Sequence, residues 1–588
     1  MSKYTKSIKS NFPFPEFRIN QEQIIEDVTE SLDQITDNFV LESPTGVGKS
    51  VISYTAAKTL CDVNIKLTRR GAETGPPILI LTSTRQLQIQ YIESFKSKND
   101  FNHIWSAKNY DCAEFPPNNK GNIDLGVHFG HPMCSGAKQC PMAKQGDCEY
   151  LTQKKKFMYS EVGVTNYSYF TSSTALKPNI LICDEAHNLQ KILCDKAALS
   201  LSVGQLMFFE NQINSGAKGE LTADFNKESV LLERLFKDPQ IKSGTFQTPD
   251  ALDRITVYVD EMYEKLKTLI GKLEVIILRY SSQKAKYKKQ IVKLHKIKTV
   301  MVEVYEKYDK YLSSNAQWVY NFTEVKIKND DMMDVIEVKP LEVNEYFDMV
   351  IGRRTKKNLF MSATICGVKQ FCGELGIVDW DFKQTNTTIP VENRTVHVVK
   401  NLGKLTYSNK NEMLPKFIAT IDRILDYLYK KGDGKKVNGI IHTVSYFNAH
   451  AILKGSKYAG DMLIPNKEEL LNLNDTITNG KANVIVSPSI LEGVDLTDDL
   501  SRFQIFLKVP YLFLGDVWVK TKMNMNRKWY SRSAIVKIVQ GCGRSIRSDE
   551  DWAETFILDG NFEKLISYDN ELFPEWFKES VRSYNITL

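Results

Sequence analysis

NFVLESPTGVGKSVISYTAAKTL, residues 38–60, runs from an apolar stretch through a glycine turn into a helical pattern. Two further apolar stretches follow, ILILTSTRQLQIQYI from Ile78 and NILICDEAHNL from Asn179. Continuous apolar runs that alternate with helical patterns indicate buried parallel strands joined by crossover helices. The sequence therefore predicts an α/β fold with a parallel sheet.

The glycine turn has the pattern of a phosphate-binding loop and lies between a strand and a helix, as such a loop requires. Backbone N–H groups of the turn cradle phosphates, and Lys49 is expected to reach the β- and γ-phosphates. We expect the Ser50 hydroxyl to bind Mg²⁺. Ser43 replaces the first glycine of the general pattern. The candidate nucleotide-binding residues of the loop are Ser43, Pro44, Thr45, Gly46, Val47, Gly48, Lys49 and Ser50.

Two acidic residues, Asp184 and Glu185, close the apolar stretch ILIC. A carboxylate at the end of a buried strand, paired with a phosphate loop, is typical of the acid that holds Mg²⁺, and we expect Asp184 to do so through water. Glu185 would orient and activate the attacking water. Together with the loop, these residues predict a site for ATP hydrolysis.

The chain has 588 residues, of which 42% are hydrophobic and 25% charged, and its net charge is +6. Such a composition indicates a soluble protein of several domains, and the charge permits nucleic-acid binding without requiring it. The N-terminus has no apolar signal segment, and no run approaches the roughly 20 apolar residues that span a bilayer. We expect an intracellular protein with no membrane partner. A cytoplasmic location in a prokaryotic or viral setting is favoured, or the nucleus in a eukaryote.

Four cysteines, Cys112, Cys134, Cys140 and Cys148, fall in a loop-rich segment that interrupts the strand–helix alternation over residues 106–158. Disulfides are rare inside cells, where clustered cysteines more often bind metal. The intervals C-x21-C-x5-C-x7-C contain no C-x2-C pair, which disfavours zinc. From the residues alone, the segment is a zinc site, an iron–sulfur site or a group of unliganded thiols.

Residues 203–335 show long helical periodicity, which is clearest in 251–280 and in the basic run KAKYKKQIVKLHKIK (284–298). This periodicity predicts an inserted helical domain with antiparallel hairpins. An apolar run typical of a buried strand follows in KNLFMSATICG (357–367). A second α/β block follows, with apolar runs at 438–444, 483–489 and 503–510.

Three shorter pieces complete the candidate site. FRINQ (17–21) resembles a motif in which a glutamine, here Gln21, reads the adenine edge, and Ser362-Ala363-Thr364 resembles a motif that couples hydrolysis to domain movement. QGCGRSIR (540–547) begins at Gln540 and contains Arg544 and Arg547. These arginines are three residues apart, so they can share one helical face and reach the γ-phosphate from the second α/β domain.

In their order along the chain, these motifs resemble those of superfamily 2 helicases, and within them the XPD/DinG-type iron–sulfur DNA helicases. The resemblance covers nearly the full length. Its segments are Gln21, SPTGVGKS (43–50), TSTRQLQIQ (82–90), the four cysteines, VTNYSYF (164–170), DEAHNL (184–189), MSAT (361–364), VENR (391–394), GIIHTVSYF (439–447), LEGVDLTDD (491–499), QGCGRSIRSDED (540–551), LDGNF (558–562) and LFPEWF (572–577).

The resemblance implies two RecA-like P-loop domains with an inserted iron–sulfur module and an inserted helical arch. The expected boundaries are 1–105, 159–202 and 336–384 for the first motor domain, 106–158 for the iron–sulfur module, 203–335 for the arch and 385–588 for the second motor domain. Cys112, Cys134, Cys140 and Cys148 would ligate one [4Fe–4S] cluster. Asp495 would join the nucleotide site, and Gln540, Arg544 and Arg547 would join Lys49, Asp184 and Glu185 as catalytic residues.

The resemblance also implies an activity, that of a monomeric, DNA-stimulated and ATP-dependent DNA helicase using ATP and Mg²⁺. It would move 5′→3′ along single-stranded DNA and split forked or tailed duplexes at an iron–sulfur wedge, in settings that include DNA repair. Thr82, Ser83, Ser445 and residues 492–495 resemble positions that contact the DNA backbone.

Other residues near the cysteines are candidates for the DNA channel, although lysine runs are usually solvated and tyrosines are usually core residues. These candidates are Lys154, Lys155, Lys156, Tyr159, Tyr167, Tyr169 and Phe170. Two other functions stay open: a redox-responsive DNA-binding ATPase that does not unwind, and an ATPase that remodels protein or RNA complexes.

Overall fold

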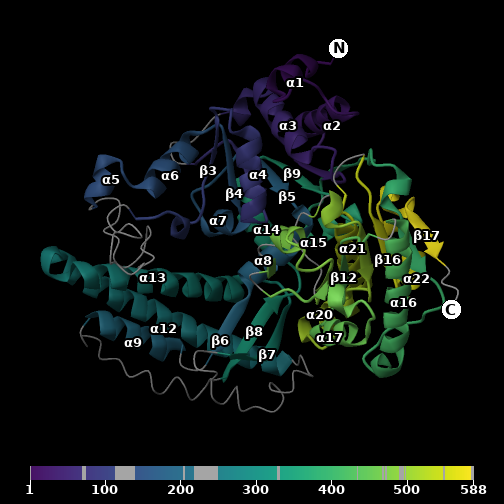
Figure 1. Ribbon diagram of the computed structural model, residues 1–588. Coiled ribbons are helices and arrows are strands. Elements are labelled where there is room, and N and C mark those ends of the chain that lie inside the picture. Colours follow the sequence, from purple (N-terminus) through teal and green to yellow (C-terminus); the bar gives the residue numbers. More distant parts are fainter. Residues whose placement is uncertain are drawn as a thin grey trace.

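The computed structural model describes residues 2–68, 74–112, 140–202, 205–217, 249–326, 332–432, 435–466, 469–470, 473–488, 496, 498–546 and 550–584. Within these ranges, two seven-stranded sheets carry the main cores, and each is parallel throughout. A helical extension projects from the side of the first sheet, away from the second (Figure 1). The predicted α/β class with two parallel-sheet domains is confirmed.

The first sheet has the order β10-β1-β9-β5-β2-β4-β3. Its strands are β1 (Asn38–Glu42), β2 (Ile78–Thr82), β3 (Phe101–His103), β4 (Val162–Asn166), β5 (Ile180–Asp184), β9 (Lys357–Ser362) and β10 (Asp381–Gln384). The helices of this domain are α1 (Thr5–Asn11), α2 (Gln21–Gln34), α3 (Lys49–Val63), α4 (Arg85–Phe95), α7 (Tyr167–Ser172), α8 (Leu189–Ala197), α14 (Asn344–Val350) and α15 (Val368–Leu375).

Both faces of this sheet are buried, which explains the unbroken apolar runs of its strands. Successive residues point to opposite faces: Ile80 belongs to the core that includes α2 and α3, whereas Leu79 and Leu81 belong to the core on the other side. The polar residues then follow the strands at their carboxyl ends, where the loops of a parallel sheet gather to form ligand sites.

The second sheet has the order β13-β14-β12-β15-β16-β11-β17. Its strands are β11 (Val396–Val399), β12 (Gly439–His442), β13 (Met462–Leu463), β14 (Val484–Ser487), β15 (Phe503–Phe506), β16 (Glu554–Ile557) and β17 (Val581–Tyr584). Its helices are α16 (Lys410–Lys431), α17 (Tyr446–Gly455), α19 (Leu473–Thr478), α20 (Val517–Met525), α21 (Arg527–Cys542), α22 (Asn561–Tyr568) and α23 (Glu575–Lys578).

The helical insertion contains α9 (Gln205–Ala217) and two long helices, α12 (Pro249–Ser282) and α13 (Lys284–Ser313), which pack side by side. The expectation of a helical domain over 203–335 has to be amended. The segment also contains β7 (Trp318–Lys326) and the start of β8 (Met332–Pro340), which pair with β6 (Leu199–Ser202) in an antiparallel sheet. The boundary expected at 335/336 therefore falls inside β8.

The cysteine segment is described only in part. After Cys112 the described chain resumes at Cys140 and forms α5 (Pro141–Gln145) and α6 (Glu149–Tyr159). No helix in the described ranges has the length and apolar character that crossing a membrane requires.

Helix α6 docks on the first sheet through a glycine. A Cβ at Gly163 of β4 would lie 2.6 Å from a ring carbon of Phe157 on α6 and 2.5 Å from Pro76. The ring therefore packs directly on the strand backbone. This contact fixes the helix that leads from the cysteine segment back into the motor domain.

We expect Gly163→Ala to destabilise the docking of α6 by about 1–3 kcal/mol, because the added methyl overpacks this contact. Hydrogen exchange across residues 149–166 should become faster. Gly271→Ala is the matched control: nothing lies within 4 Å of its Cβ position on α12. Alanine there should stabilise the helix by about 1 kcal/mol. Unchanged exchange in Gly163→Ala would contradict this account of the docking.

Candidate functional site

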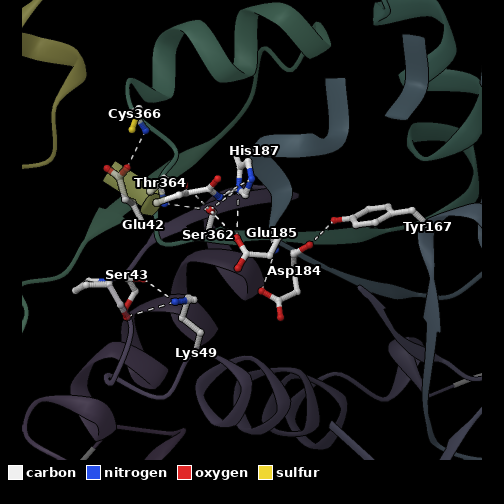
Figure 2. A network of polar contacts seen from close by, with 12 residues as sticks. Glu42, Ser43, Lys49, Tyr167, Asp184, Glu185, His187, Ser362, Thr364 and Cys366 are labelled. Carbon is white, nitrogen blue, oxygen red and sulfur yellow. Dashed lines mark hydrogen bonds and ion pairs between the residues drawn. The ribbon is translucent and has the colours of Figure 1, made fainter. Parts of the chain in front are cut away.

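The phosphate-binding loop leaves the sheet directly after β1 and ends at the first residue of α3. Gly46 and Gly48 have φ angles of 92° and 91°, a conformation that favours glycine. The Lys49 ammonium donates to the backbone carbonyls of Ser43 (2.9 Å) and Pro44 (3.3 Å), as Figure 2 shows for Ser43. The lysine therefore lies inside the curve of the loop, where phosphates bind.

Two residues that precede the loop in the sequence, Arg18 and Gln21, support it. The Gln21 side-chain amide donates to the carbonyl of Val47 (3.2 Å) and accepts from the backbone N–H of Arg18 (3.1 Å). A Cβ at Gly48 would lie 2.5 Å from the Gln21 amide nitrogen, so the glutamine packs directly on the loop. The Arg18 guanidinium donates to the carbonyl of Gly46. In this structure Gln21 therefore braces the loop, and its contact with adenine stays a prediction.

Asp184 is the last residue of β5 and is almost fully buried. Its carboxylate accepts from the Tyr91 hydroxyl (3.1 Å) and from the backbone N–H of Glu185 (2.9 Å), and the Tyr167 hydroxyl donates to its backbone carbonyl (2.8 Å). Burial, and then the neighbouring Glu185 carboxylate, raise the pKa of Asp184. A bound cation would favour the ionised form, which is what a magnesium ligand needs.

Glu185 has a different electrostatic environment from its neighbour. Burial alone would raise the pKa of this carboxyl, but the hydrogen bond of His187, together with the positive charges of Lys49 and Arg544, outweighs it and holds the pKa low. The His187 ring nitrogen Nδ1 lies 3.3 Å from the Glu185 carboxylate. The backbone of Glu185 is left-handed, with φ 51°, a strained conformation of the kind that occurs at functional sites.

His187 links both motor domains, and the sequence analysis assigned it no role. Its Nδ1 lies 2.8 Å from the Ser362 hydroxyl, whereas its Nε2 lies 2.7 Å from the Gln540 amide nitrogen of the second domain. Because an amide nitrogen can only donate, His187 Nε2 accepts and Nδ1 carries the proton. The Ser362 hydroxyl also accepts from the Thr364 N–H (3.0 Å), as in Figure 2. The DEAH tetrapeptide was the signal that could have identified this histidine.

Two cavities flank the loop. One, of about 360 Å³, is lined by residues of both motor domains, including Thr45, Glu185, Gln540 and Arg544. The other, of about 980 Å³, lies on the far side of the loop, against Phe17, Arg18 and the segment 383–388. The first cavity reaches the loop at Thr45, and the second reaches it at Gly46 and Val47.

Several predicted site residues lie outside the described residues, namely Asp495, Arg547 and Cys134. Of the other residues expected to contact DNA, Thr82 is fully buried, and Ser83 lines the smaller cavity. Ser445 caps α17, accepting from the N–H of Asn448 (3.2 Å). The contact of Thr82 with the DNA backbone stays a prediction.

The aromatic residues near the cysteines divide into two groups. Tyr167 and Phe170 are buried, so these two candidates for base stacking are core residues. Tyr159 is 69% exposed and follows the exposed lysines 154–156 on α6. Tyr169 is half-buried, with its hydroxyl 3.5 Å from that of Tyr150.

Three of the four predicted cluster ligands are described, and none of them is in a disulfide. Cys140 and Cys148 immediately precede α5 and α6 and make no side-chain capping bond there. The rings of Tyr110 and Tyr150 lie 5.5 Å apart, which brings the segments of Cys112 and Cys148 together. No group of three or more potential metal ligands occurs within the described residues, a set that excludes Cys134. Thiolates are the donors that an iron–sulfur cluster takes, but the three described cysteines are not gathered into one ligand group.

Comparisons with protein families identify both motor domains. Residues 444–580 match the Helicase C-terminal domain family, and residues 14–207 match the family described as Type III restriction enzyme, res subunit. The match at 14–207 includes strands β1 to β5 of the first sheet, and the match at 444–580 includes β13 to β16 of the second sheet.

Curated relatives include an ATP-dependent DNA helicase CHL1 of Saccharomyces cerevisiae, 20% identical over 76% of this chain. The match spans 58% of that protein, so the chain accounts for little more than half of its length. The ATP-dependent DNA helicase YoaA of Escherichia coli is 22% identical over 72% of this chain and 68% of its own length.

Solved structures extend the fold match to nearly the whole chain. An XPD helicase structure covers 97% of this chain and 100% of its own, with a TM-score of 0.57 and 16% identity. Xpd4 of S. tokodaii gives a TM-score of 0.55 over 96% of this chain at 12% identity. The family matches, the relatives and the fold agree with the order of the motifs and support an XPD/DinG-type helicase of superfamily 2.

Proposed function

We propose that this protein is an ATP-dependent DNA helicase that moves 5′→3′ along single-stranded DNA and opens duplexes. One observation carries the proposal: Glu185, directly after β5 of the first domain, and Arg544, just after α21 of the second domain, line the same cavity beside the phosphate-binding loop. An ATPase site shared by two RecA-like domains changes shape as it binds and hydrolyses nucleotide. Such a site can therefore drive movement along a strand.

Each residue of the site has a role that follows from its position. The loop N–H groups and Lys49 bind the β- and γ-phosphates, and Ser50 and Asp184 would hold Mg²⁺. The magnesium ion would neutralise charge that develops on the phosphates. Because His187 holds the pKa of Glu185 low, Glu185 stays ionised and can accept a proton from the attacking water. Arg544 would stabilise negative charge on the γ-phosphate from the opposite domain.

One hydrogen bond connects the second domain directly to the catalytic residues of the first. Gln540 of the second domain donates to His187, and His187 contacts both Glu185 and Ser362. A rotation of the second domain therefore changes the hydrogen bonds of the residue that orients Glu185. This contact supports coupling between nucleotide hydrolysis and domain movement.

The cysteine segment would form the wedge that separates the strands. We propose that Cys112, Cys134, Cys140 and Cys148 hold a [4Fe–4S] cluster, which would fix the shape of a segment with little apolar core. The exposed lysines of α6 suit the phosphates of a nearby strand. The substrate would be single-stranded DNA and forked or tailed duplexes, bound by a monomer and with little sequence preference.

Lys49→Ala and Glu185→Gln should each lower the kcat of ATP hydrolysis at least about a hundredfold, because they remove phosphate binding and water activation. Lys416→Ala and Glu412→Gln are matched controls, since these residues form an exposed ion pair on α16. Steady-state phosphate release measures the effect. Normal ATP turnover in either site variant, with the fold intact, would contradict the assignment of Lys49 and Glu185 to the ATPase site.

Removal of a proposed cluster ligand should release metal without abolishing ATP hydrolysis. Cys140→Ser and Cys148→Ser, purified without oxygen, should lose most of their iron, whereas Cys61→Ser on α3 should keep it. Iron and zinc analysis of each protein is the measurement, and ATP turnover should persist because the motor site is separate. Stoichiometric zinc in the unaltered protein would contradict the proposed [4Fe–4S] cluster.

A duplex with a 5′ single-stranded tail should be opened, and one with only a 3′ tail should not. Strand release followed by gel electrophoresis or fluorescence measures this. The opposite preference would reject the polarity. ATP hydrolysis stimulated by DNA, with neither duplex opened, would favour the redox-responsive ATPase that does not unwind.

A further inference from the structure

A buried charged junction joins the two motor domains away from the nucleotide cavities. Arg532 belongs to α21, whose residues Ile535 and Val539 pack in the core of the second sheet. Its guanidinium instead contacts the first domain: Nε donates to the backbone carbonyl of Ile365 (2.9 Å), and Nη1 donates to Glu374 (3.2 Å). The side chains of Arg532 and Glu374 are only 6% and 5% exposed. Water therefore contributes little to the solvation of this pair.

One peptide group connects Arg532 to the phosphate-binding loop. The peptide between Ile365 and Cys366 accepts from Arg532 through its carbonyl, and its N–H donates to the Glu42 carboxylate (2.8 Å). Figure 2 shows Glu42 and Cys366 joined in this way, next to the loop that begins at Ser43. Hydrogen bonds in such a chain polarise one another, so a change at the guanidinium affects the carboxylate. Cys366 is held in a left-handed conformation, with φ 53°.

The charges of the junction are divided between the domains. The first domain supplies two buried carboxylates, Glu42 and Glu374, whereas the second supplies Arg532 and the buried Lys522 of α20. The Lys522 ammonium donates to the carbonyl of Leu341 (2.7 Å). A buried charge is costly unless an opposite charge accompanies it. Removal of one charged residue of the junction would therefore destabilise the folded protein by leaving its partner buried alone.

The ion pair uses only half of its hydrogen-bonding capacity. Within the described residues, Arg532 Nη2 and Glu374 Oε1 are buried and make no hydrogen bond. Arginine and carboxylate groups often pair through two parallel bonds, and these idle atoms are complementary to each other. A bond between these two atoms would make the ion pair bidentate.

We propose that Arg532 is a positioning residue that couples rotation of the second motor domain to the phosphate-binding loop, through the Ile365–Cys366 peptide and Glu42. This coupling rests on the proposed ATP-driven movement of the two domains. The helix that carries Arg532 also carries Gln540 and leads into Arg544. Closure on a nucleotide and movement of Arg532 are therefore parts of one rigid-body rotation.

Two variants separate coupling from folding. Arg532→Lys keeps the charge but loses the planar fork, and the double variant Glu374→Met with Arg532→Met replaces the whole ion pair by apolar side chains, which leaves neither partner buried alone. Lys528→Met is the matched control, because Lys528 lies on the same helix in an exposed ion pair with Glu571. Each protein is assayed for affinity toward a fluorescent ATP analogue and for kcat and KM of ATP hydrolysis, with and without single-stranded DNA.

Both junction variants should bind the analogue within about twofold of the unaltered protein. They should lose at least about fivefold in the stimulation of kcat by DNA, the range typical of coupling between sites. Lys528→Met should behave as the unaltered protein does. Full stimulation in both junction variants overturns the proposal, and so does an equal loss of analogue binding and kcat, which indicates a structural role.

Hydrogen exchange gives a readout that needs neither turnover nor DNA. Adding a non-hydrolysable ATP analogue should slow exchange across residues 362–376 in the unaltered protein but not in the junction variants. Equal slowing in all proteins would overturn the coupling. If the unaltered protein shows this slowing and yet opens no duplex, the result contradicts the proposed helicase function but not the coupling role of Arg532.

Discussion

The position of β9 between β1 and β5 is the constraint on which the nucleotide site depends. Parallel pairing sets Glu42 beside Ser362 and Asp184 beside Met361, so the three strands end in line. The phosphate loop, the acidic pair and the segment after Ser362 therefore emerge at one edge of the sheet. Since β9 follows the helical insertion in the chain, that insertion must leave and re-enter the motor domain without disturbing this alignment. The antiparallel sheet β6-β8-β7 forms its base.

The sequence contained enough information to predict the motor sheets and the phosphate loop, because both depend on local patterns. Buried parallel strands are apolar throughout, and Gly48 precedes Lys49 in a recognisable order. The order of the strands and the alternating pattern of 318–326 were missed, the latter because the helical periodicity before it dominated the interpretation. Side-chain partners depend on distant segments. For that reason neither the bracing role of Gln21 nor the contact of His187 with Gln540 could be derived from spacing.

Three buried carboxylates lie close to the phosphate-binding loop or to the junction of the two domains. Glu42, Asp184 and Glu374 are all nearly inaccessible to water, at a cost in desolvation that apolar residues would avoid. Glu42 and Asp184 each have hydrogen-bond partners from more than one segment of the chain, and Glu374 is bound by Arg532 of the second domain. Apolar surfaces can slide past one another, whereas hydrogen-bonded charges favour a small number of discrete arrangements. A motor that cycles between defined domain positions needs that property more than it needs maximal stability.

Helices α20 and α21 connect these features physically. On α20, the Trp518 indole donates to the carbonyl of Pro340 (2.9 Å), the last residue of β8 at the base of the helical insertion. On α21, Arg532 binds the first domain, and Gln540 contacts His187 at the nucleotide site. One helical hairpin thus contacts the insertion, the first motor domain and the catalytic network. Because helices are stiff, a nucleotide-driven rotation of this hairpin would reach the insertion without a long chain of side-chain rearrangements.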